Sequence, residues 1–175
     1  MTTSRTHRAT LSFASLLLAS SLTLTACGSS DEGPVSADAG TVVTVASIDG
    51  QQISLPAAGK PAAVFFFSVG CGECVGGVGS LGQAAIDAEE AGIDAQFLAV
   101  DMDPREPRET IESFMEYVDA EHVPAAIDEG AALSQRFEVV ALSTLIVVDA
   151  DGKVTFRATD PDADTIVAEL DKAGA

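Results

Sequence analysis

Apolar residues recur in short runs from residue 42 onward, and turn residues separate these runs. Val42–Ala46 and Gln52–Leu55 alternate apolar and polar positions on either side of Asp49-Gly50, a pattern that predicts a β-hairpin. Ala62–Phe67 is continuously apolar, which is typical of a strand buried on both faces. Gln96–Val100 has the same character. These runs predict an N-terminal hairpin followed by two buried strands.

Helical periodicity is clearest in Glu106–Ala120, where apolar residues recur three and four positions apart and acidic residues occupy the opposite face. Further helices are expected at Leu81–Glu90, Glu129–Phe137 and Asp162–Ala173. Further strands are expected at Val123–Ile127, Leu145–Val148 and Val154–Phe156.

The last two of these strands flank a second hairpin signal, Asp149–Lys153. Parallel strands joined by helices therefore come first, and an antiparallel pair comes last. This order predicts an α/β fold with a mixed central sheet, helices on both of its faces and an N-terminal β-hairpin. A length of 175 residues favours one domain with a sizeable core.

The N-terminus has the features of an export signal. Arg5 and Arg8 precede an uncharged apolar stretch, Leu11–Leu24, which is too short for a typical spanning helix. Leu24–Cys27 then resembles a bacterial lipobox, which implies cleavage after Ala26 and a diacylglycerol on the Cys27 sulfur. An ordinary secretory signal with a free Cys27, or an uncleaved anchor, are the alternatives.

This interpretation divides the chain into a lipoprotein signal peptide (1–26), a flexible tether (27–40) and a folded domain (41–175). It places the protein on the extracytoplasmic face of a cell membrane, periplasmic or extracellular. The formal net charge of −18 argues against nucleic acid or an anionic lipid surface as the main partner. Solubility or a basic protein partner would account for this charge.

The chain has three cysteines, and Cys71 and Cys74 form a C-x-x-C pair between an expected strand and an expected helix. Unpaired N–H groups at a helix N-terminus favour a thiolate. We therefore expect Cys71 to be the nucleophile and Cys74 to be the resolving thiol. Glu73 lies between them, where its carboxylate would raise the pKa of a nearby thiol or would simply point to water.

These residues resemble the thioredoxin-like superfamily, and more closely its TlpA-like branch of membrane-anchored thiol–disulfide oxidoreductases. The segments that carry the resemblance are Ile48–Gly50, Gly59–Pro61, Phe65–Phe67 leading into Cys71–Cys74, and Val147–Val154. The resemblance spans about Thr41–Gly174. It implies a thioredoxin-like fold, disulfide exchange with protein partners and a role in cytochrome c maturation.

The chain departs from the family pattern at three places. Gly70 stands where an aromatic residue usually precedes the first cysteine, and Phe65 and its neighbours supply no buried acid. The family's cis-proline position falls at Ser143 or at its neighbours Leu142 and Thr144, so we expect trans peptide bonds there. The absence of the cis-proline would alter substrate docking and leave the thiols more open, including to metal.

Two other functions remain open from the sequence. The dithiol could hold a soft ion such as Cu(I), although His122, the only histidine after residue 26, is expected in a surface loop. Alternatively, the dithiol is a structural disulfide of a non-catalytic interaction module. The oligomeric state and the identity of the redox partner are not predicted.

No cofactor is expected. Gly77–Gly82 matches the dinucleotide pattern G-x-G-x-x-G, but it begins ten residues past Phe67, too far from the strand. Five scattered aspartates are expected in solvated turns rather than in a calcium site: Asp101, Asp103, Asp128, Asp149 and Asp151.

Overall fold

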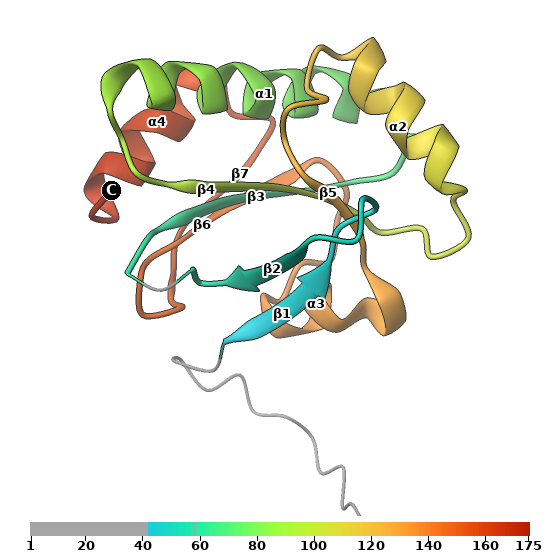
Figure 1. Cartoon of the computed structure of the whole chain (residues 1–175), viewed down its shortest axis with the longest axis horizontal. Helices are drawn as coiled ribbons and strands as arrows, with labels where there is room; N and C mark the ends of the chain where they lie inside the picture. Colours follow the sequence, from blue (N-terminus) through green and yellow to red (C-terminus); the bar gives the residue numbers. More distant parts are fainter. Residues whose placement is uncertain (1–41, 58) are drawn as a thin grey trace, which may run out of the picture. The chain divides into compact units, whose positions relative to one another are not determined.

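The computed structural model describes residues 42–57 and 59–175. The expected signal peptide, Cys27 and the tether lie outside the described residues. A five-stranded sheet forms the centre of the fold (Figure 1). Its strands are β3 (Ala62–Phe67), β4 (Gln96–Asp101), β5 (Ala125–Ile127), β6 (Thr144–Val148) and β7 (Val154–Thr159), in the spatial order β5-β4-β3-β6-β7.

The expected mixed sheet is confirmed. β3 pairs in parallel with β4, and β4 in parallel with β5, whereas β3–β6 and β6–β7 are antiparallel pairs. All six residues of β3 are buried, as its continuously apolar sequence predicts. The carboxyl end of β3 leads into the segment that contains Cys71 and Cys74. At this end Phe67 lies opposite Asp101 of β4.

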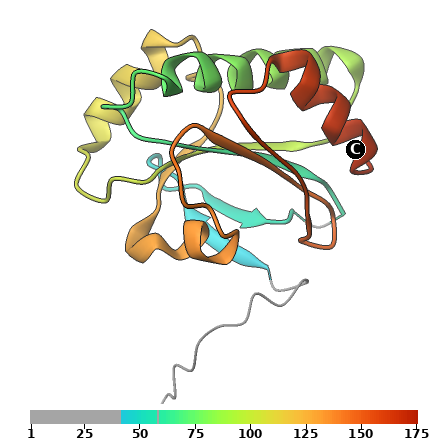
Figure 2. The ribbon, with the colours of Figure 1, turned by 180° about the vertical axis from the view of Figure 1, so that it is seen from behind.

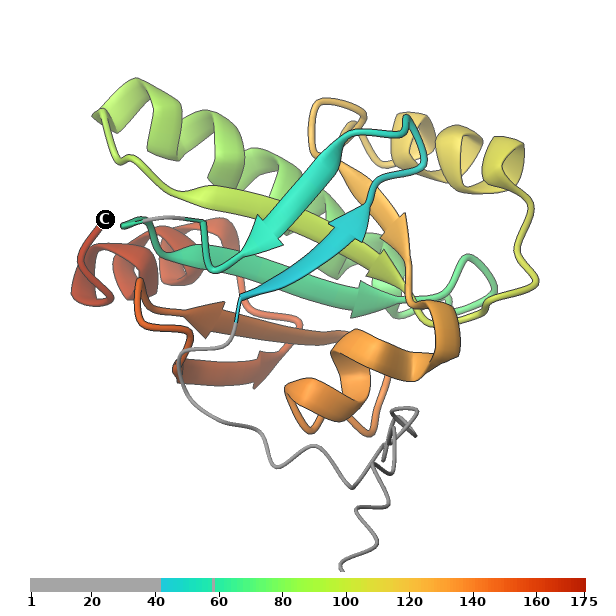
Figure 3. The same cartoon turned by 60° about the horizontal axis from the view of Figure 1, so that its bottom comes forward.

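Helices cover both faces of this sheet. Helices α1 (Cys74–Ala91), α2 (Arg108–Tyr117) and α4 (Ala163–Lys172) cover one face (Figures 1 and 2). The short helices η1 (Glu129–Ala131) and α3 (Ala132–Arg136) follow β5, and α3 lies on the opposite face with the N-terminal hairpin (Figure 3). The fold is thus thioredoxin-like in its layers.

The N-terminal hairpin is also confirmed. Strands β1 (Val43–Ala46) and β2 (Gln52–Leu55) pair antiparallel and form a separate two-stranded sheet. Ile53 and Leu55 pack into the core on the α3 face of the central sheet. The turn is tied to the central sheet by a hydrogen bond from Ile48 N–H to the Ala125 carbonyl, 2.8 Å long.

Helix α1 begins earlier than its sequence predicts. The expected start at Leu81 is wrong, because the helix already begins at Cys74 and runs through several glycines that lower helix propensity. Two of those glycines are required by packing. A Cβ at Gly77 would overlap the Phe65 ring, and one at Gly82 would lie 2.9 Å from the Ala120 Cβ.

Helix α2 is shorter than the expected Glu106–Ala120. Pro107 precedes it in an extended conformation, and Asp119 has a φ of 56°, which ends the helix. The expected apolar stripe is buried, with Ile111, Phe114 and Met115 in the core. Among the described residues, no helix is both long and apolar enough to cross a membrane.

Candidate functional site

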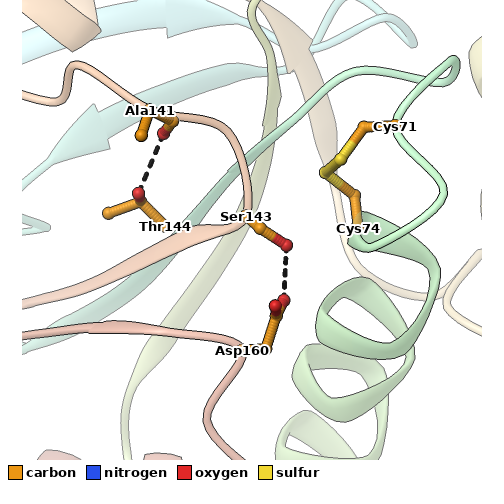
Figure 4. The surroundings of a disulfide bond; sticks show 6 residues. All are labelled: Cys71, Cys74, Ala141, Ser143, Thr144 and Asp160. Carbon is orange, nitrogen blue, oxygen red and sulfur yellow. Dashed lines mark hydrogen bonds between the residues drawn. A yellow bond between two sulfur atoms is a disulfide. The ribbon is translucent and has the colours of Figure 1, made fainter.

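Cys71 and Cys74 form a disulfide at the junction of β3 and α1 (Figure 4). Their Cα atoms are 5.3 Å apart. The junction turns tightly because Cys71 N–H donates to the Ser68 carbonyl (2.9 Å) and Cys74 N–H donates to the Cys71 carbonyl (3.0 Å). The expected context of strand, C-x-x-C pair and helix is therefore present, with Cys74 as the first helical residue.

The two cysteines differ in exposure. Cys74 is fully buried and packs with Phe65, Phe67 and Val78 in the core under α1, whereas Cys71 is half-buried. A partner sulfur approaching from solvent therefore meets Cys71 first. This asymmetry fits the expected division between an attacking thiol and a resolving thiol, and the catalytic roles themselves stay predictions.

Glu73 is exposed at the N-cap position of α1. Its side chain makes no capping hydrogen bond. A carboxylate at this place is attracted by the positive end of the helix dipole, as a thiolate at Cys71 would be. The Glu73 carboxylate and a Cys71 thiolate would thus both lie at the positive end of the α1 dipole. Because Glu73 is exposed, water screens the effect of its charge on the thiolate.

Ser143 occupies the loop in front of β6 and is buried, with a φ of 60°. The only cis peptide bond among the described residues is Leu55–Pro56, so the bonds around Ser143 are trans, as expected. The Ser143 hydroxyl donates a hydrogen bond to Asp160 Oδ1 (Figure 4). In return, Asp160 N–H donates to the Ser143 carbonyl at 3.2 Å.

Asp160 follows β7, has a φ of 45° and was not singled out by the sequence. Its Oδ1 lies 2.8 Å from the place that a Cβ on Gly77 would occupy. Gly77 is three residues after Cys74 in α1, so the carboxylate lies on the helix face that carries Cys74. The signal available in the sequence is Asp160-Pro161 directly before a predicted helix, which marks a turn but not this contact.

Asp101 corrects the expectation of a solvated turn. It is fully buried at the end of β4 and, being paired with Phe67, faces the α1 side of the sheet. Burial raises its pKa to about 6, although Oδ1 accepts a hydrogen bond from Asp103 N–H at 2.8 Å. Its Oδ2 is buried without a hydrogen-bond partner. A buried acid is therefore present at the end of β4, although β3 supplies none.

Asp128 is a second exception to the solvated-turn prediction. It is buried, and its carboxylate accepts hydrogen bonds from Leu133 N–H (2.8 Å) and Ser134 N–H (3.1 Å) in α3. Asp149 instead organises the exposed β6–β7 turn by accepting from Asp151 N–H and Lys153 N–H. These aspartates are structural.

A cleft of about 320 Å³ lies beside the loop that leads to Cys71. Ser68, Met102 and Leu142 line it, together with Asp103, Pro104 and Arg105. The side chain of Arg105 pairs with Asp103 at 3.0 Å, and this hydrogen bond lowers the pKa of Asp103. The cleft offers apolar surface from Met102, Pro104 and Leu142 beside Ser68, three residues before Cys71.

The other sequence candidates lie elsewhere. His122 Nε2 is 2.9 Å from the Gly82 carbonyl, two turns along α1 from Cys74, so it supports the helix and does not join the dithiol. Gly77–Gly82 lies inside α1 and not in a strand–helix turn, so it cannot act as a dinucleotide loop. Within residues 42–57 and 59–175, no three His, Cys, Asp or Glu side chains converge as a metal site.

A family profile and a related protein both match most of this chain. The profile of the family described as Redoxin matches residues 34–173. A relative named "Mercury resistance operon ORF3", from Streptomyces lividans, is 55% identical over 151 residues, which cover 86% of this chain and 77% of that protein.

Two solved structures share the fold. One is a secreted Mycobacterium tuberculosis disulfide oxidoreductase homologous to E. coli DsbE, with a TM-score of 0.60, 19% identity and coverage of 74% of this chain and 95% of that chain. The other is the exposed lipoprotein thioredoxin Etrx1 from Streptococcus pneumoniae, with a TM-score of 0.63, 20% identity and coverage of 75% and 99%. At these identities the likeness concerns the fold alone.

Proposed function

This chain belongs to the Redoxin family, and from that premise we propose that it is a thiol–disulfide oxidoreductase that exchanges disulfides with protein partners through Cys71 and Cys74. The observation that carries the proposal is the disulfide at the β3–α1 junction, with one half-buried and one fully buried sulfur. A purely structural disulfide, as in a non-catalytic module, has no need of an accessible sulfur at a helix N-terminus.

The exchange proceeds in two steps. In the reduced protein, the Cys71 thiolate attacks one sulfur of a partner disulfide, forms a mixed disulfide and releases the other partner sulfur as a thiolate, which takes up a proton. Cys74, after losing its proton, attacks the Cys71 sulfur and releases the second partner sulfur. The partner gains two electrons and this protein becomes the disulfide seen in the structure. The reverse sequence oxidises a partner dithiol.

Glu73 tunes this equilibrium in the proposal. Its carboxylate opposes the stabilisation that the α1 N-terminus gives to a Cys71 thiolate. A less stable thiolate makes the reduced form a better electron donor. Glu73 therefore shifts the equilibrium toward the reducing direction, and the potential of the partner decides which way electrons flow.

Export and lipid anchoring complete the proposal. The basic N-terminus, the apolar stretch and Leu24–Cys27 support a diacylglyceryl anchor on Cys27 at the extracytoplasmic face of the membrane, with a TlpA-like role in cytochrome c maturation. In a cell fractionation, the wild-type protein should enter the detergent phase and the Cys27→Ser variant should not. Equal partitioning of both would remove the anchor from the proposal.

Turnover tests the proposed activity. The reduced protein should reduce insulin or an oxidised apocytochrome, and Cys71→Ser should abolish this reaction. Cys74→Ser should accumulate a mixed disulfide between Cys71 and the partner, because nothing then resolves it. Cys27→Ser is the matched control and should keep full activity in detergent-free solution. Full turnover by Cys74→Ser would contradict the mechanism.

Mercuric ion is a second candidate, favoured by the 55% identity to "Mercury resistance operon ORF3". Thiolates select soft metal ions, and two sulfurs within one helical turn can hold one such ion between them. Binding would release two protons and would need the dithiol, with no change of oxidation state. Mercuric ion or Cu(I) would here be captured cargo.

Titration of the reduced protein with mercuric chloride, followed by intact mass measurement, separates the two candidates. Capture predicts one mercury atom retained against competing glutathione, lost in both Cys71→Ser and Cys74→Ser and absent from the oxidised protein. A dithiol that releases mercury to glutathione while still reducing insulin supports the oxidoreductase alone. Cu(I) titrated in the same way tests the broader metal hypothesis.

A further inference from the structure

The hydrogen-bonded pair of Ser143 and Asp160 lies against the part of α1 that contains Cys74 (Figure 4). We propose that this pair covers Cys74 and thereby decides which of the two sulfurs a partner can reach. The inference refines the proposed function, since it concerns the sulfur at which exchange begins. The inference can be tested without measuring turnover.

The first argument is the position of Asp160. Its Oδ1 fills space that Gly77 leaves open, and the Phe65 ring fills the rest. Residues three apart on a helix are neighbours on one face, so Asp160 lies one turn from the Cys74 side chain. Asp160 as a residue is exposed, so it lies at the outer side of this contact.

The second argument is the position of Ser143. The last pair between β3 and β6 is Phe66 with Thr144, so Ser143 lies one step further, beside Phe67. Phe67 and Cys74 belong to the same buried cluster. Ser143 itself is 2% exposed, so it lies in the interior beside this cluster.

The third argument is that two hydrogen bonds join these residues in both directions. The Ser143 hydroxyl donates to Asp160 Oδ1, and Asp160 N–H donates to the Ser143 carbonyl. The loop before β6 is thereby fixed to the segment between β7 and α4. Both residues have positive φ, at 60° and 45°, so the chain accepts backbone strain to hold them there.

The consequence is selectivity between sulfurs. With the pair closed, a partner disulfide or a thiophilic reagent reaches Cys71 and cannot reach Cys74. If the pair opens, Cys74 also forms mixed disulfides with external sulfur. Such adducts at Cys74 occupy the resolving thiol and block its attack on Cys71.

Alkylation of Cys74 in the reduced Cys71→Ser chain measures the proposed cover directly. Ser143→Gly removes the hydroxyl at a φ that glycine adopts without strain, and Asp160→Gly removes the carboxylate in the same way. Asp160→Asn keeps an acceptor oxygen and tolerates positive φ. Ser113→Ala is the matched control, because it deletes a hydroxyl that bonds only within α2.

The rate of N-ethylmaleimide addition to Cys74 is followed by peptide mass mapping from pH 6 to 11. We expect the plateau rate, where the thiol is fully ionised, to rise at least about fivefold in Ser143→Gly and Asp160→Gly and to change less than twofold in Asp160→Asn and Ser113→Ala. A shift of the midpoint pH with an unchanged plateau would mean an effect on acidity and would overturn the proposal.

A bulkier reagent gives a second measurement of access to Cys74. A maleimide carrying a long polyethylene glycol chain should remain slower than N-ethylmaleimide at Cys74 in every variant that stays folded. Equal rates for both reagents would indicate unfolding of the whole domain rather than opening of the pair, and the proposal would then fail for that variant. Labelling does not depend on insulin reduction, so this result stands whether or not the oxidoreductase function does.

Discussion

Gly77 of α1 packs directly on the ring of Phe65 in β3, with no space between them for a Cβ. This contact brings the helix that begins with Cys74 close to the central strand of the sheet. It also leaves the gap into which Asp160 reaches. The close approach explains a glycine that helix propensity alone would disfavour.

Gly77→Ala should therefore destabilise the protein by about 1–3 kcal/mol, because the added methyl forces Phe65 or the helix to move. Gly76→Ala is the matched control, since a Cβ there meets nothing within 4 Å. It should stabilise the helix by about 0.5–1 kcal/mol. Urea unfolding followed by circular dichroism measures both, and equal effects at the two positions would contradict the packing argument.

The pKa of Asp101, raised to about 6 by burial, links stability to pH. Between pH 4 and pH 6 the folded protein binds more protons at this group than the unfolded chain does, so its contribution to stability falls as the pH rises. Asp101→Asn removes that dependence. The stability of the variant relative to wild type should improve by roughly 1–2 kcal/mol between pH 4 and pH 7.

Unfolding free energies at a series of pH values test this dependence. Asp149→Asn, which also removes one carboxylate but in the exposed β6–β7 turn, is the control for the change in charge. A constant difference between Asp101→Asn and wild type from pH 4 to pH 7 would be incompatible with a protonated Asp101 in that range.

Glu73→Gln should make the protein more oxidising. Removing the carboxylate at the N-terminus of α1 favours a Cys71 thiolate and so stabilises the reduced form. Because the side chain is exposed, the expected rise in reduction potential is small, about 5–20 mV. Equilibration with glutathione buffers measures it, with Glu89→Gln at the far end of α1 as control. A potential that falls would reverse the assigned role of Glu73.

Asp128→Ala should cost about 2 kcal/mol of stability, because Leu133 N–H and Ser134 N–H at the start of α3 lose their buried acceptor. Asp162→Ala removes an exposed cap of α4 that serves only Thr165 N–H, and it should cost about 1 kcal/mol. Thermal unfolding measures the loss of stability in each of the two variants. A smaller loss at Asp128 than at Asp162 would contradict the importance of burial.

Much of this fold was predictable because local pattern and tertiary environment agree. Ala62–Phe67 is apolar throughout and is buried throughout, and Asp49-Gly50 forms the turn that its chemistry predicts. The C-x-x-C pair predicted a helix that begins at the dithiol, but the helical pattern alone placed the start at Leu81. The glycines between favour a loop locally, and only the approach of Phe65 and Ala120 explains them inside a helix.

The site was predictable in part for the same reason. The C-x-x-C pair is local in sequence, so Cys71 and Cys74 could be located together. The contact between Ser143 and Asp160 joins residues 17 apart across the β6–β7 hairpin, and no periodicity signals it. The burial of Asp101 likewise depends on the elements packed over the end of β4, which its acidic side chain alone does not reveal.

The N-terminal hairpin distinguishes the two faces of the central sheet, because it packs on one of them and α1 packs on the other. The polypeptide joins β1 at Val43, in the layer that packs on the face of the sheet opposite α1 (Figure 3). An attachment through residue 42 would join the domain on the face of the sheet opposite α1, the helix that begins with Cys74. Cys71 would then be presented outward, toward molecules that arrive from the surrounding medium.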